Sequence, residues 1–216
     1  MLASGRRTAA VLRDNRKVTD RLSLSMWLPP QLSNWRTRYY EKILSLTPFS
    51  QREQPQSTLT VRAINMAEPP LLEQALNGPV NLEEVGAILA EYQGNDIAFD
   101  LESWWDLWQY TENDWQVKPT RILLSCFAQD FDNGTSLAPP EQEDLRIDFG
   151  VDTSFLPQPD LAGSGKLTES NVKSLLHLVR QIEEALPLER RLLETESGEN
   201  FAEKLRLALG GHSTTQ

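Results

Sequence analysis

The chain has 216 residues, of which 39% are hydrophobic, and its formal net charge is −10. This length and composition are enough for a buried core and predict one domain with tails rather than two full domains. Nucleic acid is not expected as a ligand, because binding to phosphate backbones needs clustered Lys and Arg and the body of the chain is strongly acidic. No membrane association is expected either, since no apolar run approaches the length of about 20 residues that a membrane span needs.

The first 26 residues differ from the rest in charge. They hold six Lys/Arg and two Asp, which leaves a charge of −14 on the remainder, with 15 Lys/Arg and 29 Asp/Glu. This contrast predicts a basic, disordered leader over residues 1–26, a single domain over residues 27–209 and a disordered tail over residues 210–216. The leader also loosely resembles an organelle transit peptide, and a translation start at Met26 is a further alternative.

Cysteine usage bears on the compartment. Cys126 is the single cysteine, so an intramolecular disulfide is impossible, and the sequence has no apolar signal region. Both observations favour a reducing, cytoplasmic location.

In the first half of the chain, the spacing of apolar residues predicts two helices around one strand. The alternation and β-branching of residues 58–64 predict the strand. A helix capped by Ser33 is predicted before it and ends ahead of Pro48; a second helix begins at Asn81, with Glu84 placed as in a capping box. A short helix is predicted for residues 71–76. The first helix carries Trp35, Tyr39, Ile43 and Leu46 on one side, and the second carries Val85, Ile88, Leu89 and Tyr92.

Residues 95–117 contain four tryptophans and six carboxylates without any Lys or Arg. An antiparallel meander is predicted from residue 97 onward, in which Ile97, Phe99, Leu101, Trp105 and Leu107 share one parity and face the core. A helix is the alternative, because Leu101, Trp104, Trp105 and Trp108 also have helical spacing. The strand interpretation turns Trp104 and Trp108 away from the core.

In the second half of the chain, the pattern of apolar residues predicts two more strands and two more helices. Residues 119–131 are apolar on both faces and predict a central strand, while residues 145–151 alternate and predict a half-exposed strand. Thr168 and Ser197 are placed to begin the helices. The predicted fold class is therefore α+β, with an antiparallel sheet of about four strands covered by amphipathic helices.

Known chemical motifs are matched only in part. Residues 130–134 depart from the calcium-loop pattern, and residues 163–166 lack the strand and the Ser/Thr of a P-loop. Cys126 lies mid-strand and is interpreted as a small core residue, and the two histidines and one cysteine are too few for a dependable zinc site. Neither a metal nor another cofactor is predicted. Asp130, Asp132 and Asp148 stay an alternative as a divalent cation site.

The tryptophans beside carboxylates carry the functional hypothesis. We expect a non-catalytic protein-interaction module whose acidic, Trp-containing surface binds a basic protein, as an inhibitor or toxin-immunity protein does. The predicted partner-binding residues are Asp100, Glu102, Trp104, Asp106, Trp108 and Asp114. The alternative is an Asp/Glu-dependent hydrolase that acts on carbohydrate or uses a divalent metal, since acidic pairs beside aromatic rings also suit sugar chemistry.

Overall fold

A computed structural model describes residues 20–30, 32, 36–52, 56–134, 142–158, 160–198 and 200–210, without the side chains of residues 207–210. Seven antiparallel strands form one sheet in the order β3-β2-β4-β5-β6-β1-β7. The fold is thus α+β with an antiparallel sheet, as predicted, but with seven strands rather than about four. The strands are β1 (Arg21–Trp27), β2 (Ser57–Ala63), β3 (Leu72–Leu76), β4 (Ile97–Thr111), β5 (Asp114–Phe127), β6 (Leu145–Val151) and β7 (Arg190–Thr195).

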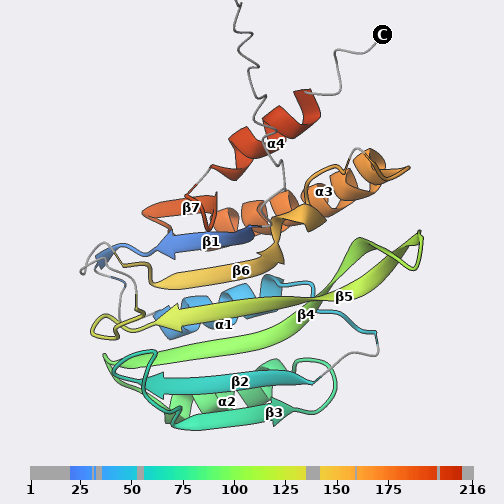
Figure 1. Ribbon diagram of the computed structural model, residues 1–216. Helices are drawn as coiled ribbons and strands as arrows, with labels where there is room; N and C mark the ends of the chain where they lie inside the picture. The colour runs from blue at the N-terminus through green and yellow to red at the C-terminus, as the bar shows by residue number, and fades with distance from the viewer. Residues whose placement is uncertain are drawn as a thin grey trace, which may run out of the picture.

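Helices cover one face of this sheet (Figure 1). They are α1 (Arg36–Leu46), α2 (Leu82–Glu91) and α3 (Ser164–Ala185). The 3-10 turn η2 (Asp152–Ser154) comes before α3, and α4 (Phe201–Gly210), at the end of the described chain, lies beyond the β7 edge (Figure 1). Asn81 caps α2 as predicted, accepting hydrogen bonds from the backbone N–H of Glu83 and Glu84. The last helix is capped by Asn200 rather than by Ser197, whose hydroxyl donates to Asp20 instead.

The core lies between the helices and the strand residues of one parity. Leu24, Leu59, Leu101, Leu124 and Ile147 are fully buried and belong to one apolar cluster with residues of the helices. Trp105 is 3% exposed, and its ring lies 5.8 Å from that of Phe149 and 6.5 Å from that of Phe155. The parity predicted for residues 97–107 is confirmed, and the helical alternative for this segment is wrong.

The N-terminal leader and both edge strands of the sheet differ from the sequence prediction. The prediction of a disordered leader over residues 1–26 is wrong at its C-terminal end, because β1 begins at Arg21. This strand lies between β6 and β7, with Leu22, Leu24 and Met26 in the core. Residues 71–76, predicted as a short helix, contain the edge strand β3. The other edge strand, β7, was not predicted. Both edge strands are short. The partner of β7 is β1, which is far away in sequence, and the partner of β3 is β2, which lies across a loop. The local sequence pattern of each edge strand is therefore weak.

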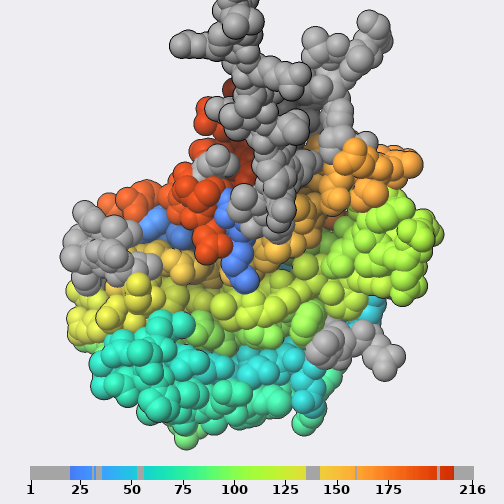
Figure 2. Space-filling model, viewed as in Figure 1, coloured from blue at the N-terminus to red at the C-terminus, as the bar shows by residue number. Residues whose placement is uncertain are grey.

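The other face of the sheet is open to view in Figures 1 and 2. Its central hairpin, β4 with β5, extends past the neighbouring strands and bends toward α3 (Figure 1). The hairpin turns at Glu112 and Asn113, both of which have positive φ, and this is the geometry that two-residue turns matched to the strand twist require. Trp115 at the tip donates a hydrogen bond from its indole nitrogen to the carbonyl of Ala162, at 2.8 Å, just before α3.

Candidate functional site

Four of the six predicted binding residues lie on the open face of β4. Successive side chains of a strand point to opposite faces, so the burial of Leu101 and Trp105 places Asp100, Glu102, Trp104 and Asp106 on the side without helices. Trp108 follows with the same parity, and Asp114 lies beyond the turn, opposite Thr111.

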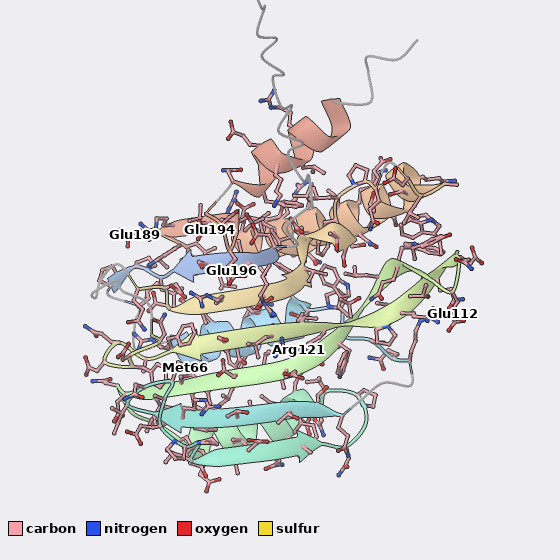
Figure 3. All side chains as sticks on the ribbon, in the orientation of Figure 1. Met66, Glu112, Arg121, Glu189, Glu194 and Glu196 are labelled. Atoms are coloured by element: carbon pink, nitrogen blue, oxygen red, sulfur yellow. The ribbon has the colours of Figure 1, made fainter. Side chains whose placement is uncertain are left out.

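The acids on this face are compensated by arginines. Glu102 forms an ion pair with Arg121 of β5, with 2.6 Å between Oε2 and Nη2. Asp106 accepts from Arg52 Nε at 3.2 Å and from the hydroxyl of Ser50 at 2.6 Å. Arg121 lies mid-sheet on the face seen in Figure 3. The open face is therefore a band of alternating charges and is not uniformly acidic.

Asp100 is the buried member of this band. Burial raises the pKa of its carboxyl above the usual value, against the hydrogen bond from Ser125 Oγ at 2.5 Å and the charges of Arg62 and Arg146. The Nε atoms of Arg62 and Arg146 are both buried and have no hydrogen-bond partner among the described residues. Asp100 is thus a buried carboxyl group beside arginines rather than an exposed anion.

The two tryptophans of the predicted surface are both half-buried. The indole nitrogen of Trp104 is buried and lacks a hydrogen-bond partner within the described part of the chain. The backbone of Trp108 is held by Asn171 of α3, which accepts from its N–H and donates to its carbonyl, each at 2.9 Å. Both rings are therefore neither core residues like Trp105 nor freely exposed anchors.

A second surface, which the sequence analysis missed, lies in the loop of residues 64–71 between β2 and β3. Ile64, Met66 and Leu71 expose 58%, 41% and 54% of their surface. Ile64 has a φ of 72°, and the N–H of Asn65 donates to the carbonyl of Ala63 at 2.8 Å, as in a positive-φ γ-turn. This conformation is a genuine outlier for a β-branched residue.

Hydrogen bonds hold this loop in place at both ends of the turn. Ile64 donates its N–H to the carbonyl of Asp96 and accepts at its own carbonyl from the N–H of Asp132, each at 2.8 Å. The side chain of Asn65 accepts from the N–H of Ala67 and of Glu68. The exposed apolar side chains are therefore presented by a fixed backbone, at the end of the sheet where Met66 is labelled in Figure 3.

Carboxylates surround the apolar loop. The loops of residues 92–96 and 128–134 meet residues 64–66 through the hydrogen bonds of Asp96 and Asp132. Arg62 is the one Lys or Arg within residues 57–75, 92–96 and 128–134. We call this surface the acidic end; it consists of Ile64, Met66 and Leu71 with the exposed acids Glu68, Glu73, Asp96, Asp130 and Asp132.

The carboxylates and the cysteine considered as metal ligands or as a nucleophile have other surroundings in the structure. Among the described residues, no group of three His, Cys, Asp or Glu side chains is arranged to hold a metal ion. Asp148, one of three carboxylates considered for a divalent site, forms an ion pair with Arg21 on the sheet. Burial raises the pKa of the Cys126 thiol to about 12, so this group is a neutral part of the core.

No helix within the described residues is both long enough and apolar enough to cross a membrane. Compared with models of known families, with curated proteins and with solved structures, the chain gives no significant match.

Proposed function

We propose that the protein is a non-catalytic interaction module that binds a basic protein partner at its acidic end. The conformation of Ile64 is the observation that carries this proposal. A positive φ at an isoleucine costs about 1–3 kcal/mol, and exposing its side chain gains nothing for folding. A strained and exposed apolar residue is accounted for if its side chain is buried in a complex.

The chemistry of the partner follows from the residues around Ile64. Three apolar side chains in one loop, rimmed by charge, correspond to the apolar centre and polar rim of a protein interface. The rim consists of Glu68, Glu73, Asp96, Asp130 and Asp132. Because they form no ion pair within the described residues, a partner that brings Lys and Arg would supply the missing counter-charges.

The overall charge supports the same partner. The chain after Met26 carries −14, which attracts a cationic protein over a distance and repels phosphate backbones. A fixed loop also lowers the entropic cost of binding, since Asn65 already orders the backbone that presents the apolar side chains. Masking a basic surface in this way is what an inhibitor or immunity protein does.

The residues predicted on β4 provide a second surface for the same function. Trp104 between Glu102 and Asp106 would contact the partner on the open face, where the two acids are already paired with Arg121 and Arg52. We place the main contact at the acidic end because its carboxylates lack such partners. The same ion pairs weigh against the hydrolase alternative, since each acid is held by a different arginine instead of facing the other.

A selection of binding peptides tests the proposal. The purified chain is the bait for a random peptide library, and the Ile64→Ser/Leu71→Ser double variant is the matched counter-bait; Trp104→Ser tests the β4 surface separately. We expect selected peptides to combine Lys/Arg with apolar residues and to lose about tenfold in affinity on the double variant. Binding should also weaken as salt rises.

Three outcomes would overturn the placement or the function. Peptides that bind the double variant as tightly as the wild type, but lose affinity on Trp104→Ser, would move the contact to β4. Selected peptides without basic residues, or peptides unaffected by either variant, would contradict the proposed basic partner.

A further inference from the structure

Arg36, the first residue of α1, is a buried cation with few partners. The residue is 9% exposed, and its guanidinium lies 3.4 Å from the carboxylate of Asp144, measured from Nη2 to Oδ1. Its Nε atom is buried without a hydrogen-bond partner among the described residues. A guanidinium has five N–H donors in a planar fork, so a single long ion pair leaves it poorly satisfied for a group removed from water.

Two cavities meet at Arg36. The larger, of about 400 Å³, lies between α1, the end of α2 and strands β4 and β5, and the smaller, of about 270 Å³, lies beyond the end of β1. Arg36 and Ala128 line both. The charges of the two linings differ. Glu143, Asp144 and Glu189 line the smaller cavity, whose net charge with Arg36 is negative, so an anion is disfavoured there.

The larger cavity has the opposite balance. Its charged lining residues are two arginines and one carboxylate: Arg36, Arg38 and Glu41. Its remaining lining combines an apolar floor with amides and hydroxyls: Thr37, Leu89, Ala90, Tyr92, Gln93, Gly94, Asn95, Ile97, Phe99, Cys126 and Ala128. Residues 36–38 are also the first described turn of α1, and the positive end of a helix dipole favours an anion.

We infer that the larger cavity binds a small molecule with one carboxylate and an apolar body. The carboxylate would lie against Arg36 at the start of α1, and the apolar body would lie on Leu89, Ile97 and Phe99. A carboxylate would supply the hydrogen-bond acceptor that the buried Nε of Arg36 lacks among the described residues. The volume falls within the range of small-molecule sites, about 300–1,000 Å³. This inference is independent of the proposed protein partner.

Phenylacetate is a suitable probe, with phenylacetamide as its neutral counterpart of nearly the same shape. We expect phenylacetate, with a Kd of about 1 mM, to shift the amide NMR signals of residues 36–38, 93–95 and 126–128. Phenylacetamide should bind at least about fivefold more weakly, because it lacks the charge that pairs with Arg36.

Three variants make the test specific. Arg36→Lys keeps the charge but loses the fork and should weaken phenylacetate at least about fivefold. Because Arg36 is buried and that variant is at risk of misfolding, Ala90→Phe fills the cavity from an exposed helix position and should abolish binding with the fold retained. Arg180→Gln, at an exposed position on α3, is the control and should leave binding unchanged.

The inference is wrong if phenylacetate gives no shifts at about 10 mM, a concentration well above the expected Kd. Equal shifts from the acid and the amide would exclude the carboxylate contact. Shifts that persist in Ala90→Phe would place the probe elsewhere and would equally overturn the assignment.

Discussion

Asn171 of α3 makes the two hydrogen bonds to the backbone of Trp108 in β4 that a neighbouring strand would otherwise make. Its side-chain amide accepts the N–H of Trp108 and donates to the carbonyl of the same residue, both at 2.9 Å. Its Nδ2 donates to the carbonyl of Ser154 as well, at 2.7 Å. A buried side chain of α3 thereby satisfies the backbone of β4 beyond the last residue that pairs with β2, and it joins the β4–β5 hairpin to the helix.

Replacing this amide should be costly. Asn171→Ala leaves both backbone groups of Trp108 and the carbonyl of Ser154 without their partner, and we expect a loss of about 2–4 kcal/mol in the free energy of unfolding. Urea unfolding measures it. Ser170→Ala, an exposed neighbour on the same helix, should change stability by less than about 0.5 kcal/mol. A loss for Asn171→Ala no larger than that of Ser170→Ala would contradict the structural role of the amide.

The adjacent tryptophans of β4 should respond in opposite ways. Trp105→Ala removes a ring packed against Phe149 and Phe155 and should cost about 3–5 kcal/mol. Trp104→Phe removes an indole N–H that is buried without a partner and should be neutral or stabilise by up to about 1 kcal/mol. Chemical unfolding of the two variants is the measurement. If Trp104→Phe loses as much stability as Trp105→Ala, the assignment of the two side chains to opposite faces is wrong.

Deletion of residues 1–25 should unfold the protein. The deletion removes most of β1, which pairs with both β6 and β7 and contributes Leu22 and Leu24 to the core. Circular dichroism and thermal unfolding of the truncated chain are the measurements. A cooperative transition at the wild-type temperature would show instead that the domain folds without β1, as the charge contrast at Met26 suggested.

Patterns within one strand of this chain predict its structure, whereas pairings between strands distant in sequence have no local pattern. Residues 97–107 were placed correctly because alternation at a single strand fixes which side chains are buried. β1 was overlooked because Arg21 completes a run of basic residues, although Leu22, Leu24 and Met26 alternate. Its true context is β6 and β7, which are distant in sequence, and no local pattern contains that pairing.

The candidate sites were harder to predict for the same reason. The sequence indicates acids and tryptophans on β4 but not the arginines of β2, β5 and β6 that the sheet brings beside them. Nothing in the local sequence around Arg36 indicates that it is buried and ion-paired with Asp144, a residue far away in sequence. A positive φ at Ile64 has no sequence signature, since the residue type argues against it.

The pH dependence of stability should identify Asp100 as a destabilising buried charge. Burial raises the pKa of Asp100 in the folded state, so the folded state holds the proton more tightly than the unfolded state does. The resulting stability is present at low pH and is lost as pH rises through the unfolded and then the folded pKa. Asp100→Asn should therefore be more stable than wild type near neutral pH.

The difference between Asp100→Asn and wild type should shrink as pH falls toward about 3, below the ordinary pKa of an aspartate. Urea unfolding across this range is the measurement. Asp160→Asn, an exposed acid for which only a small effect is expected, is the control. If Asp100→Asn is less stable at neutral pH, the attraction of Arg62 and Arg146 outweighs burial, and Asp100 is a stabilising counter-charge instead.

Ile64→Gly separates folding from binding at the acidic end. Glycine adopts a positive φ without the steric cost that isoleucine has, so the substitution removes about 1–3 kcal/mol of strain. The greater freedom of glycine in the unfolded chain offsets about 0.5–1 kcal/mol of this gain. Because Ile64 is 58% exposed, little packing is lost. We therefore expect the variant to be as stable as wild type or more so.

Binding should change in the other direction. Ile64→Gly removes one apolar contact of the proposed interface, and peptides selected on the wild type should bind it about tenfold more weakly. Leu82→Ala, an exposed apolar residue on α2 outside the acidic end, is the matched control and should leave affinity unchanged. Thermal unfolding and a binding titration on the same samples give both values. A variant that loses stability but keeps its affinity would show that Ile64 supports the fold, and the strain argument for a partner at this loop would then be wrong.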